Sequence, residues 1–105
     1  MSRKKVDLAG ADPSLETLVV MVLYIAEGGP NSVQAVANLR AICDEHLAAN
    51  YRLEIVDILQ SPQRAQADGV VLTPSLTKVS PAPAAKIVGN LSDKRSVMRA
   101  LGLAH

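Results

Sequence analysis

An uninterrupted apolar run at residues 18–25, LVVMVLYI, constrains the fold of this chain more than any other feature. A Val-rich run without polar alternation is typical of a central strand that is covered on both faces. Pro30 follows closely and suits the first position of a helix, where its missing N–H would have no partner. Apolar side chains then recur every three or four residues, as on one face of an amphipathic helix: Val33, Val36, Leu39, Cys43 and Leu47. The folded part therefore begins with a buried strand and a helix that packs on it.

A second strand and a short helix are expected next. Residues 51–59 are rich in β-branched and apolar side chains, which predicts a strand. Ser61 and Pro62 are typical of a helix start, which predicts a short helix over residues 62–68 that Gly69 ends. Because a helical crossover joins the first two strands, we expect them to be parallel.

The C-terminal part is expected to form a hairpin and a last helix. Residues 70–79 predict a strand that Pro74 introduces or interrupts, and residues 85–88 predict its partner. Ser92 is a suitable cap for a helix over residues 92–103. The order βαβαββα predicts an α/β fold, a thioredoxin-like three-layer sandwich.

The prolines of this part also constrain its conformation. In thioredoxin-like folds the proline equivalent to Pro74 is cis, so we predict a cis Thr73–Pro74 bond; the alternative is a trans proline that starts an edge strand. Pro81 and Pro83 are expected to be turn residues. All three oppose a helix through residues 75–86, because proline lacks the N–H that a helix interior needs.

Length and composition favour a single domain at residues 17–105, preceded by a mobile tail at residues 1–16. Eleven basic and ten acidic residues nearly cancel, and aromatic residues are scarce, which argues against nucleic-acid binding. Cys43 is the only cysteine, so no internal disulfide forms. The longest apolar run, residues 18–26, is far too short to span a bilayer. We therefore expect a cytoplasmic protein that binds neither nucleic acid nor membrane.

No set of residues predicts catalysis, a metal or a cofactor. A redox site of a thioredoxin-like fold needs a thiolate at the start of the first helix, and residues 28–31 (GGPN) have none. Cys43 on the apolar stripe is expected to be a buried structural residue and not a reactive thiol. Ser32 could activate a substrate, but a capping or packing role is favoured. His46 and His105 have no ligand partners at suitable spacing.

The chain resembles the KaiB family of clock-associated proteins. The resemblance extends from residue 18 to residue 101, and it depends on the order and spacing of short matches. These are Leu23-Tyr24, Pro30-Asn31-Ser32-Val33, Val56-Asp57-Ile58-Leu59, Pro62-Gln63, Thr73-Pro74, Lys78, Pro81, Pro83, Lys86-Ile87, Gly89 and Leu91-Ser92-Asp93.

This resemblance implies a non-enzymatic regulator without cofactors. Family members bind the hexameric ATPase KaiC, compete with a clock-associated histidine kinase, and form homo-oligomers (a dimer or a tetramer). They also have an alternative KaiB-type fold of the C-terminal half, from Gly69 onward. The residues expected to control this change of fold are Pro74, Pro81, Pro83, Gly89, Ala100 and Gly102.

The expected partner surface lies on the first helix and the second strand. Its residues are predicted to be Arg40, Arg52, Glu54, Lys78 and Lys86. Several positions that are basic in cyanobacterial members are not basic here, namely Gln34, Ala37, Glu54 and Ala85. The chain is therefore expected to be a divergent member, outside the typical cyanobacterial set and with an altered partner surface.

Two other interpretations remain open at this point. One is a thioredoxin-fold redox enzyme or adaptor, which the missing thiol opposes. The other is a stress-response adaptor that kept the fold without a clock role, which the sequence does not separate from a clock regulator.

Overall fold

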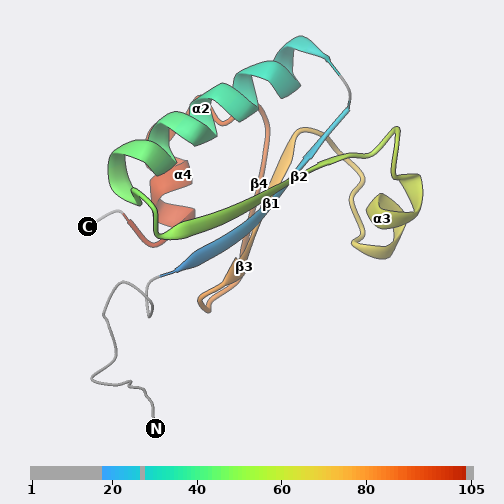
Figure 1. The fold of residues 1–105 in the computed structure, drawn as a ribbon. Helices are drawn as coiled ribbons and strands as arrows, with labels where there is room; N and C mark the ends of the chain where they lie inside the picture. Colours follow the sequence, from blue (N-terminus) through green and yellow to red (C-terminus); the bar gives the residue numbers. More distant parts are fainter. Residues whose placement is uncertain (1–17, 27, 104–105) are drawn as a thin grey trace, which may run out of the picture.

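The computed structural model describes residues 18–26 and 28–103. The predicted tail at residues 1–16 lies outside this part of the chain. Figure 1 shows the strands and helices that the described residues form. They are β1 (Val19–Ile25), α2 (Pro30–His46), β2 (Tyr51–Asp57), α3 (Pro62–Ala67), β3 (Ser75–Ser80), β4 (Ala85–Val88) and α4 (Lys94–Ala100). The predicted order βαβαββα is confirmed.

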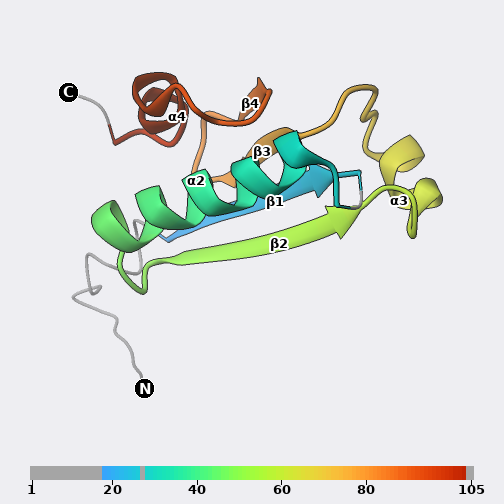
Figure 2. The same ribbon diagram turned by 90° about the horizontal axis from the view of Figure 1, so that it is seen from above.

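The strands form one mixed sheet in the order β2-β1-β3-β4. β1 pairs in parallel with β2 and antiparallel with β3, and β3 and β4 form an antiparallel hairpin. Figure 2 shows α2 running along the sheet with α4 beside it, and α3 set apart at the far end. β1 lies in the interior of the sheet, as its apolar run predicted, and β2 and β4 are the two edges.

The main core fills the space between the sheet and the pair α2 and α4. Alternate residues of β1 face this side, because successive side chains of a strand point to opposite faces. The buried members of this core are Val19, Met21, Leu23, Ala35, Leu39, Ile42, Cys43, Leu47, Leu76, Leu91, Val97 and Leu101. Leu91 joins it although its backbone has a positive φ of 62°, a conformation that is unfavourable for a leucine.

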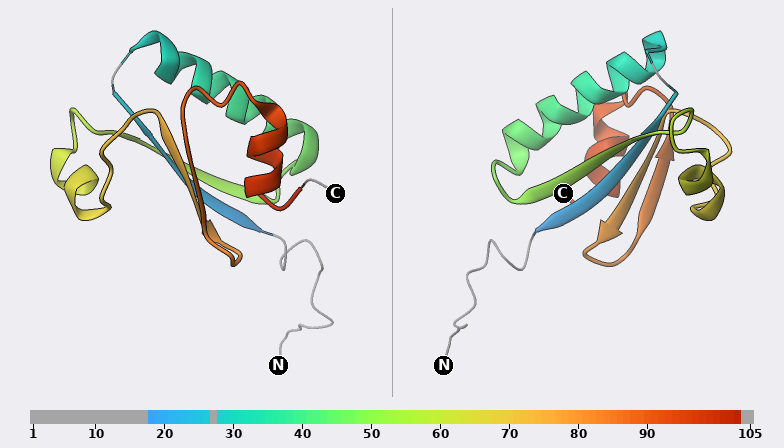
Figure 3. Two further views of the ribbon diagram at one scale, coloured as in Figure 1. Left: turned by 180° about the vertical axis from the view of Figure 1, so that it is seen from behind. Right: turned by 45° about the vertical axis from the view of Figure 1, so that its right-hand side comes forward.

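A smaller core lies on the other face of the sheet. Val22, Tyr24 and Val56 are buried there against Ile58 and Val70, which flank α3 in the sequence. Figure 3 shows α3 on the opposite side of the sheet from α2 and α4. The three predicted layers are therefore present, although α3 covers only one end of its face.

The predicted apolar stripe of α2 was wrong in phase at its start. Val33 is 58% exposed, whereas Ser32, Ala35 and Ile42 are buried. The buried face of the helix begins at Ser32 and Ala35, so Val33, one position after Ser32, points away from it. Leu39 and Cys43 are buried as expected.

Several predicted boundaries also differ from the structure. β2 ends at Asp57, and residues 70–72 are not a strand; Val71 is 89% exposed. Ser61 precedes α3 as predicted, but its side chain makes no capping hydrogen bond. The cap of α4 is Asp93, whose carboxylate accepts from the N–H of Ser96, and not Ser92.

Four of the six predicted conformational residues lie in and around the hairpin, and Ala100 and Gly102 lie at the end of α4. The Thr73–Pro74 bond is cis, as are the bonds that precede Pro81 and Pro83 in the turn between β3 and β4. Gly89 has a φ of 124°, which a side chain would strain. Ala100 is the last residue of α4 and not an interior one, because the helix is shorter than the predicted range 92–103.

Candidate partner-binding surface

The position where thioredoxin-like folds place a redox site carries no thiol. Residues 28–31 connect β1 to α2, and the nearby Ser32 is buried, with its Oγ accepting a 3.2 Å hydrogen bond from the N–H of Ala26. Ser32 therefore links the end of β1 to the first turn of α2, which agrees with the favoured packing role. Cys43 is 0% exposed, and burial raises the pKa of its thiol to about 11. These observations oppose the redox interpretation.

The structure places no metal-binding cluster of His, Cys, Asp or Glu in the described residues. His46 is paired with Glu45 at 2.9 Å, and Lys94 of α4 donates to the same carboxylate at 2.8 Å. The hydrogen bond from Lys94 lowers the pKa of Glu45. His46 and Lys94 thus both contact the Glu45 carboxylate, and the contact of Lys94 joins α2 to α4. His105 lies outside the described residues.

The turn that leads to α4 is attached to α2 by amide hydrogen bonds. Asn38 donates to the carbonyl of Asn90 at 2.9 Å, and the Asn90 amide donates to Gln34 at 2.9 Å. Gln34 is one of the positions where the family resemblance leads to a basic residue. In this chain the side-chain oxygen of Gln34 accepts the hydrogen bond from Asn90, so Gln34 helps to hold the turn on α2.

The edge strand β2 presents its charged side chains on the sheet face opposite α2. Arg52 pairs in register with Val20 and Glu54 with Val22, and both charged residues are exposed. Tyr51 and Leu53 lie on the other face and pack against the main core. This alternation results from the strand period of two.

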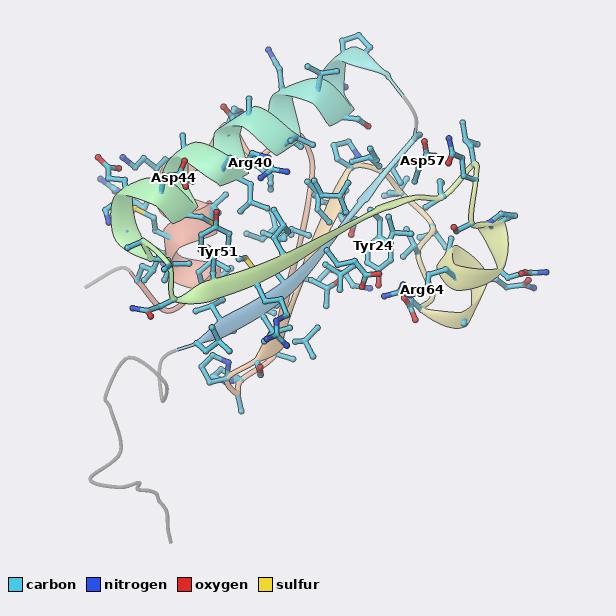
Figure 4. All side chains as sticks on the ribbon, viewed as in Figure 1. Tyr24, Arg40, Asp44, Tyr51, Asp57 and Arg64 are labelled. Carbon is cyan, nitrogen blue, oxygen red and sulfur yellow. The ribbon has the colours of Figure 1, made fainter. Side chains whose placement is uncertain are left out.

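Glu54 is held by α3. Arg64 donates two hydrogen bonds of 2.8 Å to the two oxygens of Glu54, and its Nε donates to Asp68 at 3.0 Å. The hydroxyl of Tyr24 donates a 2.6 Å hydrogen bond to the same Asp68. Figure 4 shows Tyr24 and Arg64 together on the α3 side of the sheet. This group, called the α3 clamp below, consists of Tyr24, Glu54, Arg64 and Asp68.

The clamp changes the acidity of its members. The hydrogen bond from Arg64 lowers the pKa of Glu54, and the hydrogen bonds from Tyr24 and then Arg64 lower that of Asp68. Burial, followed by the hydrogen bond to Asp68, raises the pKa of Tyr24 to about 12. Both carboxylates are therefore charged at neutral pH and are balanced by one guanidinium.

The five predicted partner-binding residues do not share one surface. Arg52, Glu54 and Lys86 lie on the same sheet face, because Lys86 pairs with Thr77, which in turn pairs with Val22. Arg40 is exposed on α2, on the opposite side of the sheet.

Lys78 departs from its expected place, because it is only 4% exposed. It is two residues from Leu76 on β3 and pairs with Met21, so it lies on the face that α2 and α4 cover. Its side chain is therefore not part of the exposed surface of this form.

Sequence reasoning missed the α3 clamp. The spacing of Arg64 and Asp68, four residues apart on a helix, was a visible signal for an ion pair. Nothing in the sequence joined either residue to Glu54 or Tyr24, because those contacts depend on where α3 lies on the sheet.

Known proteins place the chain in a family. Residues 22–103 match the family model described as the KaiB domain. The chain belongs to the KaiB family. The circadian clock oscillator protein KaiB of Microcystis aeruginosa is 42% identical over 86 residues, which are 82% of this chain and 83% of that protein. KaiB of Trichodesmium erythraeum is 38% identical over 91 residues, 87% of this chain and 88% of that protein.

Solved structures confirm the thioredoxin-like fold. The N-terminal domain of Synechococcus elongatus SasA is similar with a TM-score of 0.69 and 21% identity, covering 97% of this chain and 93% of that one. Mitochondrial thioredoxin 3 of Saccharomyces cerevisiae is similar with a TM-score of 0.66 and 13% identity, covering 86% of this chain and 82% of that one. KaiB proteins are non-enzymatic clock regulators, so membership identifies the chain as a KaiB-like clock regulator and not an enzyme. No helix among the described residues is long and apolar enough to cross a membrane.

Proposed function

We propose that this chain regulates a timing system by binding a KaiC-like hexameric ATPase in the cytoplasm. The observation that carries the proposal is the match of residues 22–103 to the KaiB domain, combined with an edge strand, β2, whose outer side pairs with no strand of the described residues and which carries exposed charges. A clock-associated histidine kinase is the proposed competitor, and a dimer or tetramer is the proposed resting state.

The β2 edge supports this proposal on physical grounds. An edge strand offers unpaired backbone N–H and C=O groups, which a partner segment can extend into a wider sheet. Arg52 projects from this strand, and Arg40 projects from α2, which lies above it. One partner that approaches the β2 edge could contact both arginines.

The test is a charge reversal that avoids the α3 clamp. Reversal of Glu54 would also release Arg64, so the suitable variant is Arg40→Glu with Arg52→Glu. We expect the affinity for the KaiC-like ATPase of the same organism, measured by calorimetry, to fall by about tenfold or more, since each tenfold corresponds to about 1.4 kcal/mol. The matched control is Arg95→Glu with Arg99→Glu on α4, which carries the same change of charge.

The thermal midpoint of each variant shows whether it is folded. Unchanged affinity of the Arg40 and Arg52 variant would move the interface elsewhere. If the unaltered chain bound no KaiC-like ATPase, the stress-response adaptor would become the better interpretation.

We also propose that the C-terminal half, from Gly69 onward, adopts an alternative fold, and that the thioredoxin-like form is substantially populated without a partner. NMR secondary shifts of the free protein test the second of these statements. Strand shifts at residues 75–79 and 85–88 would show that the thioredoxin-like form is populated. Helical shifts across residues 82–88, with a strand near residues 97–103, would show that the alternative fold predominates and would refute the second statement.

A further inference from the structure

One face of the sheet is only half covered. On the side opposite α2 and α4, the short helix α3 covers the end near Tyr24, and among the described residues no helix lies over the other end (Figure 3). Val79 and Val88 project from this side and are 54% and 51% exposed. The open face, as we call it, consists of Val20, Arg52, Thr77, Val79, Lys86 and Val88.

The strand registers order these residues into rows across the sheet. Arg52 lies beside Val20 at one end, and Lys86 lies beside Thr77 one row further along. Val20, Thr77 and Val79 lie on β1 and β3, between the two cations, whereas Val88 lies next to Lys86 on β4, in the row of Ser75 and Tyr24. The open face is therefore an apolar strip with a positive charge on each side.

The α3 clamp leaves the open face with a net positive charge, because it pairs the one acidic side chain that the described strands carry on this face. Glu54 is the only acidic side chain of the strands on this face within the described residues, and both of its oxygens accept from Arg64. Arg64 also balances Asp68. By contrast, Arg52 and Lys86 form no ion pair with another described residue. A partner that approaches the strip thus meets two cations and no free carboxylate of the strands.

The spacing of the two cations matches the width of a helix. Arg52 and Lys86 lie on β2 and β4, three inter-strand steps apart, which corresponds to about 14 Å. An α-helix with its side chains is about 10–12 Å wide. Along the strands the two cations are offset by about two residues, or roughly 7 Å, close to one helical turn. A helix that lies along β1 and β3 would place its two flanks beside the two cations.

We propose that the open face binds an amphipathic helix of a partner protein that carries acidic residues on both flanks of its apolar stripe. The stripe packs on Val20, Thr77 and Val79, and the carboxylates pair with Arg52 and Lys86. This surface shares Arg52 with the ATPase interface proposed above but lies across the sheet from Arg40. The test below changes Lys86 and leaves Arg40 and Arg52 intact, so the two proposals can fail independently.

The test uses the full chain and two synthetic peptides. Both are amphipathic helices of about 18 residues with the same leucine stripe; one has glutamates on its flanks, and the other has lysines. Each is titrated into ¹⁵N-labelled protein and followed by NMR. We expect the glutamate peptide to shift the amides of Val79, Lys86 and Val88, and the lysine peptide to leave them unchanged.

The variant Lys86→Glu with Val79→Thr should weaken binding of the glutamate peptide by about tenfold or more. Arg95→Glu with Val33→Thr, at two exposed positions of the helices, carries the same changes and is the matched control; it should bind like the unaltered chain. Equal binding of both peptides, no binding, or shifts confined to other residues would overturn the proposal. Shifts of the open face that depend on protein concentration without peptide would also overturn it, because a second copy would then be the occupant.

Discussion

Replacement of Cys43 by serine tests whether this thiol is a structural part of the core. Cys43 lies on α2, is 0% exposed and belongs to the main core beside Leu39 and Leu47. A buried hydroxyl without a good partner destabilises a protein by about 1–3 kcal/mol. The hydroxyl could bond back to the carbonyl of Leu39 in the preceding turn, which favours the lower part of this range. We therefore expect a loss of about 1 kcal/mol or more in the free energy of unfolding.

Urea unfolding followed by circular dichroism measures this loss, and Cys43→Ala is the control. Alanine removes the sulfur without adding a polar group, so it separates the effect of lost packing from that of the buried hydroxyl. Both variants should bind a partner normally under conditions where they are folded.

Thiol labelling gives an independent measurement. Burial raises the pKa of Cys43 from 9.0 to about 11, so at pH 8 the thiolate is about a hundredfold scarcer than for an ordinary cysteine. Because the thiolate is the nucleophile, a bulky disulfide reagent should react with the native protein at least about a hundredfold more slowly than with the unfolded chain. Similar rates in the two states, or no loss of stability on serine substitution, would refute the assignment.

Three further changes test other parts of the structure. Leu39→Ala removes a side chain that is 0% exposed, so the free energy of unfolding should fall by about 2–5 kcal/mol, measured by urea unfolding; a loss well below 1 kcal/mol would contradict its central place. Arg64→Leu removes the cation that lowers the pKa of Glu54 and contributes to lowering that of Asp68. A carboxylate whose pKa is lower in the folded state contributes stability that is lost as pH falls. From pH 5 downward, the free energy of unfolding of the unaltered chain should therefore fall more than that of this variant. An equal fall in the two proteins would argue against the α3 clamp. Ala100→Gly should shift the population of free protein toward the alternative fold by less than the roughly 1 kcal/mol of a helix interior, as judged by NMR peak intensities, and a shift toward the thioredoxin-like form would have the wrong sign.

The sequence predicted the strands better than the helix faces. The apolar run of β1 and the proline-bounded β4 carry local signals that the sheet then satisfies. The phase of α2 was predicted from spacing alone, and Val33 fits that spacing. Its exposure depends on which face of α2 is turned toward the sheet, which is a property of the assembled fold.

The candidate surface was less predictable, because charge in a sequence does not show which face a side chain takes. Lys78 and Lys86 are both lysines of the hairpin, yet one is buried under the helices and the other lies on the open face. The difference follows from strand register, which sequence fixes only when both partners are known. The contact of Glu54 with Arg64 likewise depends on the position of α3.

The two tyrosines of this chain allow the two faces of the sheet to be followed separately by fluorescence. It has two tyrosines and no tryptophan or phenylalanine, so Tyr24 and Tyr51 account for its intrinsic fluorescence. Tyr24 donates to Asp68 beneath α3, whereas Tyr51 donates a 3.4 Å hydrogen bond to Asp44 on α2. Replacing either one by phenylalanine leaves a single emitter that reports on one side of the sheet. Detachment of α3 and detachment of α2 could thus be timed individually in stopped-flow experiments, without any attached dye.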